Sequence, residues 1–367
     1  MNERRLEQFR NTVVENGLDG VALVPGANLL YLSTIHVHLS ERPIVFFLPA
    51  HGDPAIIIPT LEAAKAQDAG IKDERIFSWD DDEGYTTAFQ KACAQLELTD
   101  YLLGVEAQNM RVLELELLHR YSPNLTTTHV EPLIMSLRGV KDESEQKAMR
   151  KAVAAAEQAM EELIPRIKIG QTEKRIASML VQELMNAGSE ASPFTPIVSA
   201  GPNGAIPHAV PTNRKIATGD LLVIDWGAVV DDYPSDITRT FAVGPIESEM
   251  VQIYEAVKLA NETARKKAGP GTSGQDVDRA ARGVIEELGY GDEFIHRTGH
   301  GLGLEIHEPP FMMEGNTVPL EPGAVFTIEP GIYIRGKGGV RIEDDVIITS
   351  DGCESLTSFT RDLIQVG

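Results

Sequence analysis

The sequence predicts two domains in tandem, an α/β domain followed by an α+β domain. Helical and strand patterns alternate through the first part of the chain, up to about residue 135. Long helical segments and a group of β-rich segments fill residues 136–367. The chain has 367 residues, 42% of them hydrophobic, which is enough to bury a core in each domain. We therefore expect domains at 1–135 and 136–367.

The first domain is expected to contain short strands between helices. Residues 3–16 have the mixed polar and apolar spacing of a surface helix. The expected strands are 20–24, 44–48, 55–59 and 101–105, with further helices at 86–96 and 111–121. This alternation is typical of α/β proteins.

The second domain is expected to open with a long helix. Acidic residues enrich the first turn of 141–150, and an alanine-rich stretch with helical period follows. A second helix is expected at 172–187, before a loop rich in proline and glycine. The expected strands are 221–224, 238–243, 324–328 and 340–348, with helices 254–268 and 275–288 between them. We expect a large, mostly antiparallel sheet.

The net charge excludes some classes of partner. With 33 Lys and Arg against 55 Asp and Glu, the formal charge is −22. Such a chain would repel phosphate backbones and anionic lipid surfaces, so neither nucleic acid nor a membrane is an expected partner. Because the acidic residues form no long block, they are interpreted as a solvated surface.

Cysteine usage and the absence of long apolar runs predict a cytoplasmic protein. Cys93 and Cys353 are too few for a disulfide framework. The first residues lack the apolar segment of a signal peptide, and no apolar run approaches the roughly 20 residues that cross a bilayer.

Two aspartates flank a turn-like segment in the second domain. Asp225 closes the apolar run 221–224, and Asp236 follows the segment 231–235. Either one alone could be a turn-capping residue, because most aspartates are exposed. A strand-loop-strand connection could bring both carboxylates to one face, and the pair favours a functional site.

A histidine cluster follows at 296–307. His296, His300 and His307 lie in this glycine-rich stretch, where the backbone can make close approaches. Any one of them could be a structural histidine hydrogen-bonded to the backbone. Three together favour metal ligation or proton handling.

Two glutamates complete a possible metal site. Glu329 ends the run 325–328, and Glu343 shares a strand face with Arg341 by the two-residue period. Four carboxylates and one histidine form a mainly oxygen shell suited to Mn²⁺, and also compatible with Co²⁺, Zn²⁺ or Fe²⁺. Two divalent ions about 3.5 to 4 Å apart would balance the charge and activate a water for hydrolysis.

These motifs together resemble the metallopeptidase family of aminopeptidase P, prolidase and methionine aminopeptidase. The similar segments are Asp225-Trp226-Gly227, Ser235-Asp236-Ile237-Thr238-Arg239-Thr240, Gly299-His300-Gly301, Ile328-Glu329-Pro330-Gly331 and Arg341-Ile342-Glu343-Asp344. The resemblance covers the whole chain and implies a creatinase-like α/β N-terminal domain before a pita-bread catalytic domain. It also implies a homodimer, because the N-terminal domain usually contributes to the partner's active-site rim.

The resemblance implies a role for each candidate ligand. Asp225 would chelate the first metal, Asp236 and Glu343 would bridge both metals, and His300 and Glu329 would complete the second.

It also implies substrate contacts. His208 and His307 would contact the substrate carbonyl or the tetrahedral intermediate, and His296 would line the proline pocket. Arg341 would brace the carboxylates, and Tyr233 would assist less directly.

Two positions depart from the family pattern. Asp231-Asp232 stand where a glycine commonly precedes the tyrosine, which leaves the turn before Asp236 undefined. Phe311 is expected beside the far end of the substrate, where some prolidases place an arginine that holds a dipeptide's carboxylate. No Lys or Arg lies between His307 and Glu329, although another loop or the partner subunit could supply the cation. We therefore expect an aminopeptidase P-like enzyme that cleaves the Xaa-Pro bond of short peptides with proline in second position, with Xaa-Pro dipeptidase (prolidase) as the alternative.

Two other classes use a similar fold. A creatinase-like hydrolase works without metal through a histidine, and a non-catalytic relative only binds peptides. The presence of all five candidate ligands argues against both.

Overall fold

The chain forms two compact units in the computed structural model, which describes residues 1–367. The first unit is Met1–Arg138 and the second is Gly139–Gly367. Each has its own hydrophobic core. None of the helices combines the length and the apolar character that a membrane crossing requires.

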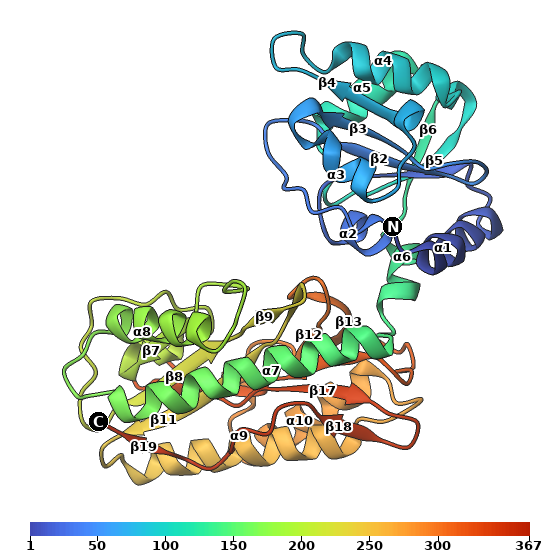
Figure 1. The fold of residues 1–367 in the computed structure, drawn as a ribbon. Coiled ribbons are helices and arrows are strands. Elements are labelled where there is room, and N and C mark those ends of the chain that lie inside the picture. The colour runs from blue at the N-terminus through green and yellow to red at the C-terminus, as the bar shows by residue number, and fades with distance from the viewer. The chain divides into compact units, whose positions relative to one another are not determined.

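The first unit is a mixed six-stranded sheet with helices on its faces (Figure 1). The strand order is β4-β3-β2-β1-β5-β6, with antiparallel pairing from β1 to β3 and parallel pairing at the flanks. The strands are β1 Gly20–Leu23, β2 Val45–Pro49, β3 Ala55–Pro59, β4 Ile76–Trp79, β5 Leu102–Val105 and β6 Thr126–His129. The helices are α1 Glu3–Glu15, α2 Ala27–Ser33, α3 Ala63–Asp68, α4 Thr86–Gln95, α5 Val112–Tyr121 and α6 Glu131–Arg138. Every residue of β1, β2 and β3 is buried, which explains the continuous apolar sequence of these strands.

The second unit has two larger sheets between two pairs of helices (Figure 1). One sheet has the order β19-β11-β8-β7 and the other β13-β12-β14-β17-β18, and two short ribbons, β9-β10 and β15-β16, accompany them. The helices are α7 Glu143–Leu163, α8 Glu173–Asn186, α9 Ser248–Lys267 and α10 Gly274–Glu287. The strands are β7 Ile197–Ala200, β8 Leu221–Trp226, β9 Val229–Val230, β10 Tyr233–Pro234, β11 Ile237–Val243, β12 Gly299–Gly301, β13 Glu308–Met312, β14 Val325–Ile328, β15 Gly331–Ile334, β16 Gly338–Arg341, β17 Asp344–Ile348, β18 Cys353–Ser355 and β19 Gln365–Val366.

Alternating residues of the strands pack against the two pairs of helices. On β14 and β17 the paired residues Val325 and Ile347 belong to the core cluster of α7 and α8. The next pair, Phe326 and Val346, belongs to the cluster of α9 and α10. Successive side chains of a strand point to opposite faces, so one strand can supply both cores. Polar side chains can then gather where the strands end.

The first helix of the second unit, α7, starts within the segment whose acidic residues predict a helix start. Asp142 caps α7 by accepting hydrogen bonds from the backbone of Ser144 and Glu145, and the Glu145 side chain accepts from the Asp142 backbone. This reciprocal capping box fixes the helix start.

The expected strand 340–348 is interrupted in the structure. The chain leaves the β15-β16 ribbon after Arg341 and joins the five-stranded sheet at Asp344. Between them, the backbone N–H of Glu343 donates to the Thr238 carbonyl of β11 at 3.1 Å. A single strand would have kept one partner throughout, whereas this break lets residues 341–345 contact both sheets.

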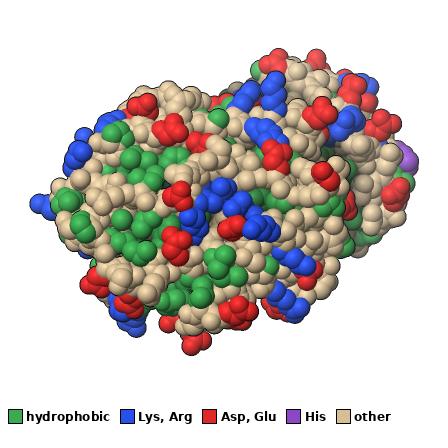
Figure 2. Space-filling view, turned by 90° about the horizontal axis from the view of Figure 1, so that it is seen from below, with side chains coloured by type: hydrophobic (Ala, Val, Ile, Leu, Met, Phe, Trp, Pro, Cys, Tyr) green, Lys and Arg blue, Asp and Glu red, His purple; other side chains and the backbone are tan.

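The surface carries charges of both signs. On the face that Figure 2 shows, acidic side chains lie scattered among basic and hydrophobic ones. This distribution fits the interpretation of the acidic composition as a solvated surface.

Candidate metal centre

A tight hairpin brings the first two carboxylates together. Asp225 lies on β8 opposite Thr238 of β11, and Asp236 directly precedes β11. The β9-β10 turn between them is formed by Asp231 and Asp232, whose φ angles of 51° and 69° are left-handed. Such a two-residue turn requires positive φ at both positions, which aspartate tolerates better than most residues.

Side chains from outside the hairpin stabilise this turn. The Glu190 carboxylate accepts hydrogen bonds from the backbone N–H groups of Asp231 and Asp232 at 2.9 and 3.4 Å. Lys151 pairs with the Asp231 carboxylate at 2.6 Å. The turn therefore forms without the glycine that the family commonly has there.

The other three candidate ligands come from the neighbouring sheet. His300 is the middle residue of β12, Glu329 follows β14, and Glu343 precedes β17. The strand β14 pairs with both β12 and β17, so the three residues lie side by side. A Cβ at Gly299 would lie 1.9 Å from the Thr327 carbonyl oxygen, so only glycine allows this approach of β12 to β14.

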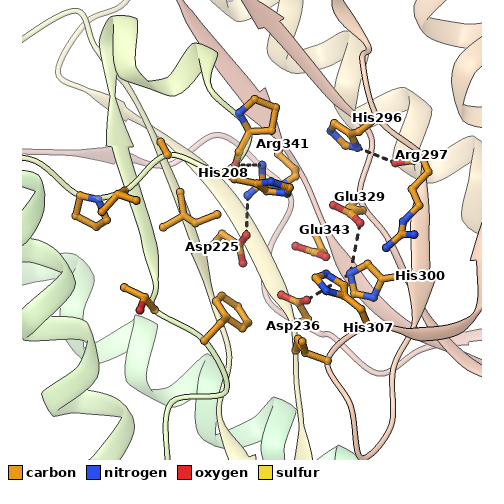
Figure 3. A pocket seen from close by; sticks show the side chains of 18 of the residues that line it. His208, Asp225, Asp236, His296, Arg297, His300, His307, Glu329, Arg341 and Glu343 are labelled. Atoms are coloured by element: carbon orange, nitrogen blue, oxygen red, sulfur yellow. Dashed lines mark hydrogen bonds and ion pairs between the residues drawn. The ribbon is translucent and has the colours of Figure 1, made fainter. Parts of the chain in front are cut away.

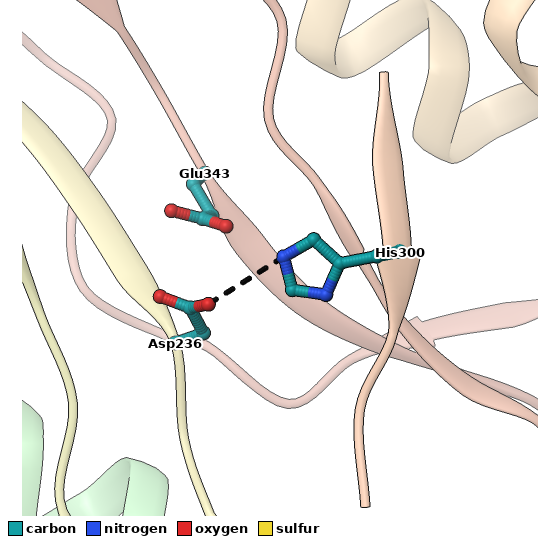
Figure 4. A group of neighbouring side chains, drawn as sticks. All are labelled: Asp236, His300 and Glu343. Carbon is teal, nitrogen blue, oxygen red and sulfur yellow. Dashed lines mark ion pairs between the residues drawn. The ribbon is translucent and has the colours of Figure 1, made fainter. Parts of the chain in front are cut away.

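The five side chains converge at one place (Figure 3). Asp236, His300 and Glu343 each offer a ligand atom, and these three atoms lie within 4.8 Å of one another (Figure 4). His300 Nε2 is 3.6 Å from Asp236 Oδ2 and 3.5 Å from Glu329 Oε1. His300 Nδ1 faces the Gly301 carbonyl at 3.1 Å, and a carbonyl only accepts, which assigns the proton to Nδ1. The Nε2 lone pair therefore faces the carboxylates.

The electrostatics of the cluster favour a bound cation. Burial, then repulsion by Glu343, raises the pKa of Asp236 well above its usual value. Burial, then Glu329, does the same to Glu343. Burial raises the pKa of Glu329 to about 7, although Arg341 opposes the shift. Asp225 Oδ1 is buried without a hydrogen-bond partner. Crowded, underpaired carboxylate oxygens next to an imidazole nitrogen fit divalent metal ions.

A hydrogen-bond chain from Arg341 joins the carboxylates to the wall of the site. Arg341 Nη2 donates to Asp225 Oδ2 at 2.7 Å, and its Nε donates to Thr238 Oγ1 at 3.0 Å. The Thr238 hydroxyl donates in turn to Glu343 Oε2 at 2.6 Å. Arg341 thereby orients one carboxylate directly and another through a hydroxyl.

The same arginine reaches His296 through a tyrosine that sequence reasoning missed. Arg341 Nη1 donates to the Tyr333 hydroxyl, which lies 2.9 Å from both this atom and His296 Nε2. His296 Nδ1 donates to the Arg297 carbonyl at 2.7 Å, so Tyr333 donates to Nε2. Burial lowers the pKa of His296 to about 4, which keeps its ring neutral. The only sequence signal for Tyr333 is its position in the β-rich segment after Glu329.

A cavity of about 730 Å³ opens over the cluster. Its lining includes all five candidate ligands, Arg341 and the three histidines expected to contact substrate, His208, His296 and His307 (Figure 3). Phe194, Ile197, Val210, Ile306 and Met313 contribute apolar surface. The cavity thus combines an apolar wall with a polar floor, as sites for small organic ligands do.

Two residues expected to contact substrate do not line this cavity. Tyr233 is buried, and its hydroxyl lies 2.7 Å from Glu145 Oε1 of α7, so it holds α7 against the hairpin. Phe311 lies under the guanidinium of Arg297, 4.3 Å from Arg297 Cζ to the ring centroid. The sequence placed them near the site, but packing turns both side chains to other partners.

Arg297 is the cation that the sequence analysis did not find. It lines the cavity, and its guanidinium makes no hydrogen bond or ion pair with the rest of the chain. The expectation from sequence rested on the absence of Lys and Arg between His307 and Glu329, and sequence spacing does not show that the segment before His307 also reaches the cavity.

The fold and the cluster define a class of protein, the metal-dependent peptidases with a pita-bread catalytic domain. The sequence profile of metallopeptidase family M24 matches residues 147–350, and the creatinase/prolidase N-terminal domain matches residues 5–140. The chain belongs to metallopeptidase family M24.

Several proteins are similar to this chain over almost its whole length. A putative dipeptidase, YkvY, from Bacillus subtilis is 33% identical over 360 residues, covering 98% of this chain and 99% of the relative. The Xaa-Pro dipeptidase of Pyrococcus horikoshii is 34% identical over 367 residues, covering 99% of both chains. The crystal structure of a prolidase from Thermococcus sibiricus superposes with a TM-score of 0.95 at 36% identity, covering 100% of this chain and 99% of that one.

Proposed function

We propose that this protein is a dinuclear-metal Xaa-Pro dipeptidase. The observation that carries this proposal is the free guanidinium of Arg297 in the cavity that holds the carboxylate cluster. A dipeptide presents its own carboxylate one residue beyond the scissile bond, and an arginine is the side chain best suited to bind it.

This proposal reverses the order of the two expectations from sequence. The preference for an aminopeptidase rested on the absence of a cation after His307, and Arg297 precedes that segment. The similar proteins reported above carry the names dipeptidase and prolidase. Both observations favour the dipeptidase.

The proposed ligands are the five residues that line the floor of the cavity. Asp225 would hold the first ion, His300 and Glu329 the second, and Asp236 and Glu343 would bridge both. Bound divalent ions, with Mn²⁺ as the proposed resident metal and Co²⁺, Zn²⁺ or Fe²⁺ as alternatives, would supply Lewis acidity for activating water.

The remaining cavity residues are proposed to bind and orient the peptide. Partial burial, and then Arg297, lower the pKa of His307, so its ring is neutral near pH 7 and can donate a hydrogen bond to the scissile carbonyl. His208 would contact the same group. His296, held by Tyr333, would border the proline ring, and Arg341 would keep the carboxylates oriented.

Two further proposals concern the protein in the cell. We propose a homodimer, on the resemblance to prolidases, which sedimentation of the purified protein would test. We propose a cytoplasmic location, supported by two free cysteines, which can remain reduced there.

One substrate comparison tests the dipeptidase proposal. Protein stripped with chelator and refilled with Mn²⁺ would be given an Xaa-Pro dipeptide, the corresponding Xaa-Pro amide and an Xaa-Pro-Yaa tripeptide. We expect metal-dependent cleavage with the highest kcat/KM for the dipeptide. A higher kcat/KM for the tripeptide would favour the aminopeptidase, and no cleavage of any Xaa-Pro bond would falsify both.

A further inference from the structure

A buried ion pair lies outside the carboxylate cluster. Lys141 Nζ donates to Glu308 Oε1 at 2.7 Å, and each side chain is only 1% exposed. Removing both charges from water offsets much of their attraction, so such a pair is a weak source of net stability. Its main effect is on the geometry of the segments that it joins.

The lysine is anchored against the strand that leads to Glu329. The Lys141 backbone N–H donates to the Gly323 carbonyl at 2.9 Å, and the preceding residue, Val140, forms a β-bridge with Ala324. The Gln146 side chain donates to the Lys141 carbonyl at 2.8 Å. The ammonium group therefore projects from a backbone held at the start of β14.

The glutamate organises the loop between β12 and β13. A Cβ at Gly303 would lie 2.3 Å from Glu308 Oε1, so the carboxylate packs directly on that glycine. Glu308 Oε2 lies 3.5 Å from the backbone nitrogen of Glu305, and the Gly303 N–H donates to the Glu305 carbonyl at 3.1 Å. The loop 302–307 is thus folded around the Glu308 side chain.

This loop ends in His307, which borders the cluster. The His307 and His300 rings meet edge to face with centroids 4.1 Å apart. His307 lies just outside the paired strands, because β13 begins with Glu308. Its direction therefore depends on how the loop before it and Glu308 after it are held.

We propose that Lys141 and Glu308 are a positioning pair that aims His307 into the cavity. The proposal rests on the proposed function, because the contact of His307 with substrate belongs to it. The pair does not touch the substrate; it joins the start of β14, which carries Glu329, to the loop that carries His307.

Kinetics and metal content separate positioning from general damage. Lys141→Met should lower kcat by about tenfold to a hundredfold, as expected for a displaced catalytic group, with KM and metal stoichiometry little changed. Lys141→Arg keeps the charge and should restore most of the activity. Arg111→Met is the control, because it leaves the buried Glu114 of the other unit unpaired and should not change kcat.

A second variant removes the pair without leaving a buried charge. Lys141→Met/Glu308→Gln should fold more readily than the single variant and still show the low kcat. In a His307→Ala background, either change should cause no further loss of kcat. A full additional loss there would mean that the pair does not act through His307.

Crystal structures test the proposal independently of catalysis. In the double variant, loop 302–307 should shift and the 4.1 Å contact between the His307 and His300 rings should be lost. An unmoved His307 would overturn the proposal even if the protein were active. If His307 were displaced in the double variant but the parent protein cleaved no Xaa-Pro bond, the positioning role would stand and the proposed function would be overturned.

Discussion

Glu343 and Asp344 are adjacent buried carboxylates with opposite surroundings. Asp344 Oδ1 accepts from Arg239 at 2.8 Å, and Oδ2 accepts from Arg361 at 2.7 Å and from Asn261 at 3.0 Å. Although burial raises the pKa of Asp344, the two arginines outweigh it and the net shift is downward. Glu343 faces other carboxylates, and its pKa is raised.

The difference distinguishes a structural carboxylate from a ligand. Asp344 obtains its positive charge from the chain itself and joins β17 to β11 and to the C-terminal segment. The cluster around Glu343 has direct contact with only one guanidinium, that of Arg341, for four carboxylates. Buried negative charge must be neutralised, so the cluster around Glu343 requires cations that the chain itself does not supply.

The largest expected effect is the loss of activity when a side chain of the cluster around Glu343 is replaced. Asp236→Asn or His300→Ala should lower kcat/KM about a thousandfold or more, equivalent to about 4 kcal/mol of transition-state stabilisation, because a ligand is lost. Activity and metal content would be measured together, with Asp232→Asn on the same hairpin as the control. Two tightly bound ions in either ligand variant would refute the assignment.

The corresponding substitution at Asp344, whose charge is neutralised by arginines, should lower the stability of the fold. Asp344→Asn leaves Arg239 and Arg361 without their buried partner, and we expect a loss of about 3 kcal/mol in the free energy of unfolding. Urea denaturation of the metal-loaded protein would measure it. If Asp344→Asn instead lost metal without losing stability, the contrast between the two carboxylates would be wrong.

Replacing Arg297 tests whether its guanidinium binds the carboxylate of a dipeptide. Arg297→Met should lower kcat/KM for an Xaa-Pro dipeptide by about tenfold to a hundredfold, because a charge-assisted hydrogen bond is lost. The Xaa-Pro amide, which has no carboxylate, should change little. Arg335→Met, at an exposed position, is the control. Equal losses on both substrates would show that Arg297 does not bind the carboxylate.

The smallest expected effect is a pH dependence of stability without metal. The pKa of Glu329 is raised from 4.5 to about 7, so its folded-state stabilisation is present below pH 4.5 and lost as the pH rises through 7. Glu329→Gln stays neutral and should become more stable than the parent by up to about 2 kcal/mol between pH 5 and 8. Unfolding in chelator would measure this difference. A difference independent of pH would contradict the raised pKa.

Local sequence patterns were sufficient for the fold class and for most of the residues that converge on the carboxylate cluster. The runs before Asp225 and Glu329 became buried strands that end near the cluster, and the acidic residues of the segment 141–150 lie in the first turn of α7. These features depend on strand and helix periods and on residues a few positions apart. The break at Ile342 was missed, because pairing with two different sheets is a property of the assembled strands.

The sequence by itself therefore determined the two-domain class and the candidate ligands, since Asp225 and Glu329 end apolar runs, Asp236 follows a turn-like segment and His300 lies in a glycine-rich stretch. Only the tertiary structure decided which cation and which rings reach the cavity. It placed Arg297 in the cavity, turned Tyr233 to Glu145 and set Phe311 beneath Arg297. These orientations depend on packing between segments far apart in the chain, which no local period encodes.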